Sequence, residues 1–194
     1  IIWNQIIAKS YVDGPGARAV LFFQGCDRRC PGCQSPDLWP MQGGATTNID
    51  VVVDALLDCN SEAVTITGGE IFLQPAALAS IVTSLKKKEP EINIVVYTGY
   101  VWEELMDWTD ERGVWRDMAL KCINTLVDGP YISALDGDSL QWMGSSNQRV
   151  IDVPLSLILG FAAASAAFLI FVVGFVFRAR KRPVVSGREE MIGA

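Results

Sequence analysis

Three cysteines lie close together in the stretch GCDRRCPGCQSP, where Cys26, Cys30 and Cys33 are separated by three and then two residues. Thiols at this spacing can share a zinc ion, form a redox pair or hold an iron–sulfur cluster. The sequence contains no histidine, and Cys59 and Cys122 fall in or beside expected core elements. A four-ligand zinc site would therefore need one of these two cysteines to cross the domain. A redox pair of Cys30 and Cys33 would leave Cys26 without a role.

A cubane [4Fe–4S] cluster is the third interpretation, and it gives the incomplete ligand set a purpose. Three thiolates from one loop bind three irons and leave the fourth iron open to a substrate or cofactor. Pro31 and Gly32 help the loop to turn, and Gly25 allows the backbone to approach the cluster closely. For Arg28 and Arg29, in the same loop, contact with a partner, contact with the cluster's negative charge and simple solvation all stay open.

The elements that must position this loop alternate between strand and helix patterns. Short runs rich in β-branched and aromatic residues alternate with segments of helical spacing, which predicts β-α-β units and a mainly parallel sheet. The expected strands cover residues 17–24, 63–68, 92–99 and 122–129, and the expected helices cover 48–58 and 75–90, with helical pieces within 101–120.

Each expected strand is followed by a polar loop that contains glycine. The four loops read GCDRRCPGC, GGE, TGY and DGP in chain order. In parallel α/β sheets, ligands bind at the carboxyl ends of the strands, where such loops converge. The sequence therefore predicts a binding site at this edge of the sheet.

The motifs together resemble a known family. A C-x3-C-x2-C motif after a first strand resembles the radical S-adenosylmethionine (SAM) enzymes, and the ordered words over residues from about 4 to 153 narrow the resemblance. They are similar to the activases of glycyl radical enzymes, specifically the proteins that activate anaerobic ribonucleoside-triphosphate reductase. These words are VDGPGAR (12–18), LFFQGC (21–26), CPGC (30–33), TGGE (67–70), YTGY with WEEL (97–105), LVDGPY (126–131) and GSSNQRVIDV (144–153).

The resemblance implies a partial (β/α) barrel of the radical SAM type that holds a [4Fe–4S] cluster and SAM. It implies that the open iron chelates SAM and that one electron cleaves the sulfonium bond. It also implies that Cys26, Cys30 and Cys33 are the iron ligands and that Gly68, Gly69 and Glu70 form the loop that holds the amino end of SAM. It further implies contacts near the adenine at Gly32 and Gln34, and other SAM contacts at Thr98 and Asp128. From its own sequence context, Asp128 is equally well a turn residue before Gly129.

The leading functional prediction is a radical SAM activase that installs a glycyl radical in anaerobic ribonucleotide reductase, with flavodoxin or ferredoxin as the electron donor. The alternatives are an activase of another glycyl radical enzyme, of the pyruvate formate-lyase type, and a membrane-tethered iron–sulfur or SAM-binding protein without catalysis. Nucleic acid is not an expected partner, because residues 1–152 carry 11 Lys and Arg against 20 Asp and Glu, a net charge of −9.

The C-terminal part differs in composition from the rest. Residues 153–177 form 25 consecutive positions without a charge, followed by RARKR at 178–182. This length predicts a membrane-spanning helix over 153–177 and a basic, disordered tail over 178–194, after a radical SAM domain at 1–152. A gene fusion or frameshift after Asp152 is the alternative origin of the tail. Because no secretory signal is apparent, we expect reduced thiols and a catalytic domain in the cytoplasm, tethered to a membrane by the C-terminal helix.

Overall fold

The structure is a computed structural model, and it describes all residues except 108–109, 111, 138, 155–164 and 174–194. The chain divides into two compact units, Ile1–Pro154 and Leu155–Ala194. In the first unit the strands are β1 (Ile2–Ser10), β2 (Arg18–Phe23), β3 (Ala45–Thr46), β4 (Ala63–Gly68), β5 (Asn93–Tyr97), β6 (Thr125–Asp128) and β7 (Arg149–Asp152). The α-helices are α1 (Ile49–Leu57), α2 (Pro75–Lys88), α3 (Trp102–Leu105) and α4 (Gly113–Leu120), and short 3₁₀ helices lie at Pro36–Leu38, Ile71–Leu73 and Ser133–Leu135.

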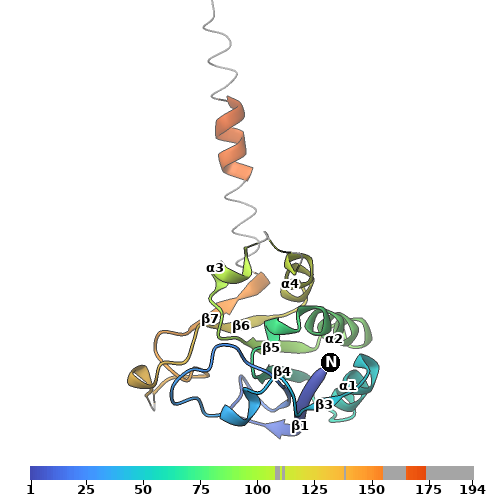
Figure 1. The fold of residues 1–194 in the computed structure, drawn as a ribbon. Helices are drawn as coiled ribbons and strands as arrows, with labels where there is room; N and C mark the ends of the chain where they lie inside the picture. Colours follow the sequence, from blue (N-terminus) through green and yellow to red (C-terminus); the bar gives the residue numbers. More distant parts are fainter. Residues whose placement is uncertain (108–109, 111, 138, 155–164, 174–194) are drawn as a thin grey trace, which may run out of the picture. The chain divides into compact units, whose positions relative to one another are not determined.

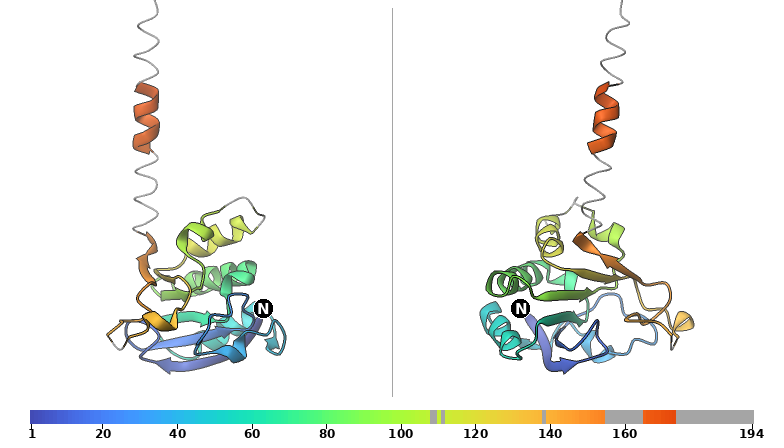
Figure 2. Two further views of the ribbon diagram at one scale, coloured as in Figure 1. Left: turned by 60° about the vertical axis from the view of Figure 1, so that its left-hand side comes forward. Right: turned by 180° about the vertical axis from the view of Figure 1, so that it is seen from behind.

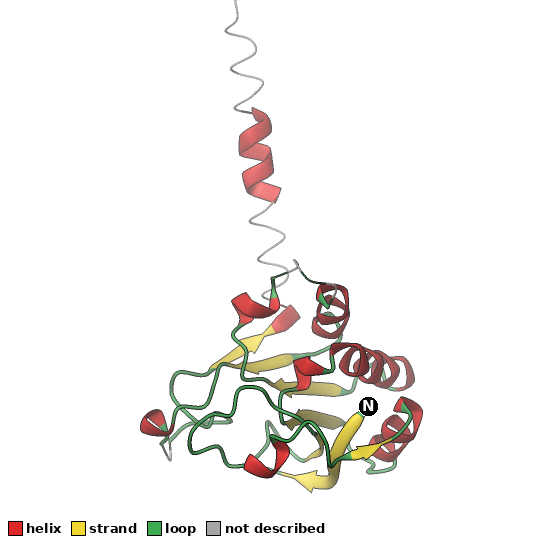
Figure 3. Ribbon diagram, viewed as in Figure 1, coloured by secondary structure: helices red, strands yellow, loops and turns green. Residues whose placement is uncertain are grey.

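The strands form one seven-stranded sheet in the order β3-β1-β2-β4-β5-β6-β7 (Figures 1 and 3). The four neighbouring strands β2, β4, β5 and β6 are parallel, whereas β1 and β3 on one side and β7 on the other are antiparallel. The parallel register places Phe23 opposite Gly68, and Tyr97 opposite Val127. The carboxyl ends of the four parallel strands therefore lie along one edge.

The helices α1, α2 and α4 cover one face of this sheet, and the long loops lie towards the other (Figure 2). Their apolar stripes explain the packing: α1 buries Val52, Val53 and Leu56, and α2 buries a longer stripe that includes Leu78 and Leu85. Pro at the first turn of α2 and three lysines in its last turn suit the two ends of a helix. This one-sided cover leaves the opposite face to the loops that follow the strands.

The predicted fold class requires a correction at the edges of the sheet. The four expected strands correspond to β2, β4, β5 and β6, but the sheet is mixed, because β1, β3 and β7 run antiparallel to their neighbours. The segment of β1 includes Asn4, Gln5 and Lys9 and does not alternate strictly between apolar and polar residues. Its strand conformation comes from pairing with β2, for example Ile6 with Leu21, which local sequence patterns do not reveal.

The prediction of a membrane-spanning helix over residues 153–177 was wrong for the part of the chain that the structure describes. No helix among the described residues is both long enough and apolar enough to cross a membrane. The described helix in this region covers residues 165–173. The predicted span at 155–164 and 174–177, and the predicted tail at 178–194, lie outside the described residues.

Candidate functional site

A cavity of about 580 Å³ lies at the carboxyl ends of the parallel strands. Its size is within the usual range for a small-molecule site. We call it the cysteine pocket, because all three clustered cysteines line it. Eight of the ten predicted site residues line it: Cys26, Cys30, Cys33, Gln34, Gly68, Gly69, Glu70 and Thr98. Gly32 and Asp128 are not among the lining residues.

The cysteine loop is held at its base by backbone hydrogen bonds. The N–H of Gly25 donates to the carbonyl of Leu38 at 2.9 Å, and the N–H of Cys26 donates to the carbonyl of Trp39 at 3.1 Å. The buried side chain of Gln24 also donates from Nε2 to the carbonyls of Asp37 and Pro40. The loop thus leaves and returns at one fixed point beside the end of β2.

Backbone N–H groups point at two of the three sulfurs. Ser35 N donates to Cys33 Sγ at 3.4 Å, and the N–H groups of Arg28 and Arg29 donate to Cys26. Burial raises the pKa of the Cys26 thiol above its ordinary value, although these backbone donors act in the opposite direction. N–H···S hydrogen bonds of this kind surround the thiolate ligands of iron–sulfur clusters and tune their potentials.

The three sulfurs do not converge on one point. Within the described parts of the chain, no three Cys, His, Asp or Glu side chains form a group that could hold a single metal ion. A cubane does not require such a group, because each of its cysteines binds a different iron. The other two cysteines lie elsewhere: Cys59 donates to Ala55 O at the end of α1, and Cys122 is in contact with Thr83 of α2.

Gly68, the last residue of β4, and Gly69, which follows it, are required by close packing against the end of β2 and the cysteine loop. Gly68 has a φ of +121°, and a Cβ there would overlap the backbone of Phe23. A Cβ on Gly69 would overlap the carbonyl of Gly25 and come to 3.0 Å from Leu38 O. The prediction that these glycines contact SAM stays a prediction, and in the structure the backbone that approaches them is that of the end of β2 and of the cysteine loop.

Glu70 joins two of the loops that line the pocket. Its side chain is 1% exposed and accepts three hydrogen bonds, from Phe72 N at 3.0 Å, Thr98 Oγ1 at 2.8 Å and Gly99 N at 2.8 Å. Burial raises the pKa of the Glu70 carboxyl to about 7, and the three donors and Arg28 only partly offset this. The carboxyl therefore fixes the end of β5 to the loop after β4.

Gly32 and Asp128 are not part of the pocket lining, and each makes contacts with other parts of the protein. Gly32 has a φ of +79°, and a Cβ there would come to 3.1 Å from Ser133 Cβ. The buried carboxylate of Asp128 accepts from Trp102 N at 2.6 Å and from Arg149 Nε at 3.0 Å. Arg149 also binds Glu103 with both Nη atoms and holds the pKa of that carboxyl down at about 2. Asp128 thus ties α3 and β7 to the end of β6.

Several residues that line the pocket were not selected from the sequence as site residues. Tyr97 ends β5, Trp39 closes the cysteine loop, and the segment around Trp142 and Gln148 follows the DGPY word. Burial raises the pKa of the Tyr97 hydroxyl to about 12. Tyr97 directly precedes the predicted site residue Thr98 at the end of an expected strand, which is a signal in the sequence, whereas the segment around Trp142 reaches the pocket only through long-range folding.

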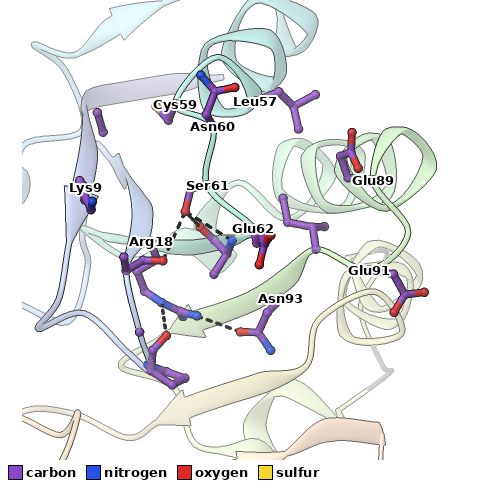
Figure 4. A pocket seen from close by; sticks show the side chains of 16 residues that line it. Lys9, Arg18, Leu57, Cys59, Asn60, Ser61, Glu62, Glu89, Glu91 and Asn93 are labelled. Carbon is purple, nitrogen blue, oxygen red and sulfur yellow. Dashed lines mark hydrogen bonds between the residues drawn. The ribbon is translucent and has the colours of Figure 1, made fainter.

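A larger cavity of about 1230 Å³ lies at the opposite edge of the sheet, near the start of β2 and β5 (Figure 4). Its buried Arg18 donates to Pro15 O at 3.3 Å, Thr65 Oγ1 at 3.1 Å and Asn93 Oδ1 at 2.9 Å. These bonds tie three segments together, which is a structural role. Because ligands of parallel α/β sheets bind at the carboxyl ends of the strands, we assign function to the cysteine pocket despite its smaller volume.

Residues 12–151 match the family model of the 4Fe-4S single cluster domain. The chain belongs to this family. It is also similar to curated anaerobic ribonucleoside-triphosphate reductase-activating proteins, with 31% identity to that of Escherichia coli strain K12, an alignment over 76% of this chain and 96% of the relative. The protein of this name from Enterobacteria phage T4 is 29% identical over 76% of this chain and 92% of its own.

The pyruvate formate-lyase-activating enzyme of Clostridium pasteurianum is another relative, at 36% identity over 55% of this chain and 48% of the relative. The resemblance to this group of activating proteins, predicted from the ordered sequence words, is confirmed by these relatives.

The cysteine pocket fits the cluster of this family and a polar ligand beside it. Three cysteines on one loop supply thiolates, and N–H groups already donate to two of the sulfurs. Two residues that line the pocket, Arg28 and Trp39, also carry buried N–H groups, Nε and Nε1, for which the described residues provide no acceptor. Buried donors of this kind are seldom left unpaired in native proteins, so both N–H groups are available to a group bound in the pocket.

Proposed function

We propose that this chain is a radical SAM activase, which uses a [4Fe–4S] cluster on Cys26, Cys30 and Cys33 to install a glycyl radical in an anaerobic ribonucleoside-triphosphate reductase. The observation that carries the proposal is the cysteine pocket, where the three thiols and the GGE loop line one cavity at the carboxyl ends of the strands. The proposal is also supported by a relative, a curated activating protein of that reductase, which aligns with this chain over 96% of its own length.

When bound, the reduced cluster supplies one electron that splits SAM into methionine and a 5′-deoxyadenosyl radical, which takes a hydrogen atom from a glycine of the partner. The chain's own residues position these groups. Gln24, Gly25 and Gly69 fix the base of the cysteine loop, and Glu70 fixes the two loops beside it. The reaction needs no general base on the protein, which agrees with the absence of histidine from the sequence.

Gly68, Gly69 and Glu70 remain the proposed contacts for the amino end of SAM, and Gln34 and Thr98 remain proposed contacts beside them. Because Glu70 already accepts three protein hydrogen bonds, its remaining acceptor capacity is limited. Its main effect on the ligand is therefore to hold the loop backbone in place. For Asp128, the bonds to Trp102 and Arg149 favour the positioning role over direct contact.

The pyruvate formate-lyase type is the second candidate for the partner, since the relative from Clostridium pasteurianum has the higher identity of 36%. That similarity covers only 48% of the relative, whereas the reductase-activating proteins are covered almost completely. We therefore favour the reductase as the partner, with an electron donor of the flavodoxin or ferredoxin class.

The test is to reconstitute the full chain anaerobically with iron and sulfide, reduce it, add SAM and measure 5′-deoxyadenosine. The expected result is product from the parent chain and none from Cys26→Ala, Cys30→Ala or Cys33→Ala. Cys59→Ala, which removes a thiol at the opposite edge of the sheet, serves as the matched control and should retain both cluster and product. A parent chain that holds its cluster but releases no 5′-deoxyadenosine would exclude the proposed chemistry.

A further inference from the structure

Arg28 is the one cationic side chain among the described residues that line the cysteine pocket. The acidic residues of this lining are Asp13 and Glu70, and the remaining lining residues are neutral or cysteine. Arg28 lies in the cysteine loop itself, between Cys26 and Cys30. A ligand with a negatively charged group therefore has one cation to bind in this part of the pocket.

The guanidinium of Arg28 is held in place from outside the cysteine loop. Its Cζ lies 3.8 Å from the centre of the Tyr100 ring, and its Nη2 donates to Glu104 Oε2 at 2.6 Å. Tyr100 in turn donates from its hydroxyl to Asp27 at 3.0 Å, and Glu104 Oε2 also accepts from Val101 N at 2.8 Å. Stacking and pairing of this kind fix the plane of a guanidinium before a ligand arrives.

One donor of this fixed group remains without an acceptor. The Nε atom of Arg28 is buried, and none of the residues that the structure describes accepts a hydrogen bond from it. A buried N–H without a partner is costly, so native proteins seldom leave one unpaired. The stem of Arg28 lies close to Gly99, where an added Cβ would come to 3.0 Å from Arg28 Cγ.

We propose that Arg28 binds the carboxylate of the amino-acid part of SAM, and that Tyr100 and Glu104 hold its guanidinium ready for this contact. The inference rests on the proposed function, because it names the contact of one ligand group in the same pocket. A guanidinium edge presents parallel N–H donors that match the two oxygens of a carboxylate. The Nε–H then gains the acceptor that it lacks.

The experiment compares two ligands that differ only in this group, SAM and decarboxylated SAM. Binding of each is measured by equilibrium dialysis to the cluster-loaded, unreduced full chain, for the parent, Arg28→Gln and Arg28→Lys. We expect Arg28→Gln to weaken binding of SAM about tenfold or more and to leave binding of decarboxylated SAM within twofold. Arg28→Lys retains the charge without the planar donor edge, so its loss for SAM should be smaller.

Arg29→Gln is the matched control, since it removes the same charge from an exposed side chain of the same loop and keeps the backbone N–H that donates to Cys26. It should leave the affinity for both ligands unchanged, and iron content is measured for every variant. Equal weakening of both ligands by Arg28→Gln, or SAM affinity within twofold of the parent, would overturn the inference. In either case, binding of SAM by the parent would leave the proposed function intact, whereas failure of the parent to bind SAM would contradict both.

Discussion

Glu70 provides a quantitative test of the forces inside the pocket. Burial favours the neutral carboxyl, and the hydrogen bonds from Phe72 N, Thr98 Oγ1 and Gly99 N favour the carboxylate. The outcome is a pKa raised from the ordinary 4.5 to about 7. Because the folded chain then holds this proton over a pH range where the unfolded chain has released it, the free energy of unfolding should fall as pH rises.

The size of this effect follows from the two pKa values. Each pKa unit corresponds to about 1.4 kcal/mol, so the full penalty is roughly 3 kcal/mol, and it develops from about pH 4.5 to about pH 7. Between pH 5 and pH 8 the loss should be about 2.5 kcal/mol. The substitution Glu70→Gln removes the titrating group. The side-chain oxygen that remains can still accept from Phe72 N and Thr98 Oγ1, whereas the new NH2 group lies opposite Gly99 N, which is itself a donor. The loss in free energy of unfolding caused by this mismatched contact, about 1–3 kcal/mol, should therefore not depend on pH.

The assay is urea unfolding of the full, cluster-free chain under reducing conditions, followed by tryptophan fluorescence and repeated at several pH values. The quantity of interest is the difference in free energy of unfolding between the parent and Glu70→Gln, in which the titration of all other groups cancels. We expect the parent's advantage to shrink by about 2–3 kcal/mol from pH 5 to pH 8. A constant difference would refute the reasoning, because it would mean that the three hydrogen bonds outweigh burial and keep Glu70 ionised throughout.

Three further predictions concern the packing of the site and its ligands. Replacing any one of Cys26, Cys30 and Cys33 by Ala should abolish the iron–sulfur absorbance of the reconstituted chain, whereas Cys122→Ala should keep it; a bound cluster in Cys30→Ala would contradict the ligand assignment. Gly69→Ala should lower the free energy of unfolding by about 2–3 kcal/mol or more, because its Cβ meets the backbone of Gly25. Gly137→Ala, whose Cβ has only Leu140 at 4.0 Å, should change urea unfolding little, and an equal loss in both variants would argue against the close packing. Arg149→Met should cost about 1–3 kcal/mol, since it strips a buried carboxylate, Asp128, of its charged partner. Lys121→Met, at an exposed pair with Asp117, should cost less than about 0.5 kcal/mol, and similar thermal unfolding of these two variants would count against the buried pair.

The parallel part of the sheet and the gathering of most candidate site residues at one edge were accessible from the sequence. The runs that became β2, β4, β5 and β6 are strongly apolar, and their glycine-containing loops must converge at one edge when the strands are parallel. The spacing of Cys26, Cys30 and Cys33 led to the prediction, still untested, that the iron–sulfur chemistry lies at this edge. Local patterns sufficed because each of these features lies within a short stretch of chain.

The remaining features depend on contacts between distant residues. The strands β1 and β7 form through pairing, and neither segment shows a strong strand pattern of its own. Arg28 meets Glu104 across 76 positions of sequence, and Glu70 meets Thr98 across 28. Whether Gly69 faces a ligand or the backbone of Gly25 depends on the path of the cysteine loop in space. Such facts follow from tertiary packing rather than from residue type.

The central claim is that the cysteine pocket generates a radical that takes hydrogen from a glycine of an anaerobic ribonucleoside-triphosphate reductase. The most direct measurement uses that reductase labelled with deuterium at the α-carbon of its glycines. It is incubated with the reduced, cluster-loaded full chain and SAM, and the 5′-deoxyadenosine is analysed by mass spectrometry. The account predicts 5′-deoxyadenosine that carries one deuterium, together with a glycyl radical signal in the reductase by electron paramagnetic resonance. Unlabelled 5′-deoxyadenosine and no such signal would contradict it.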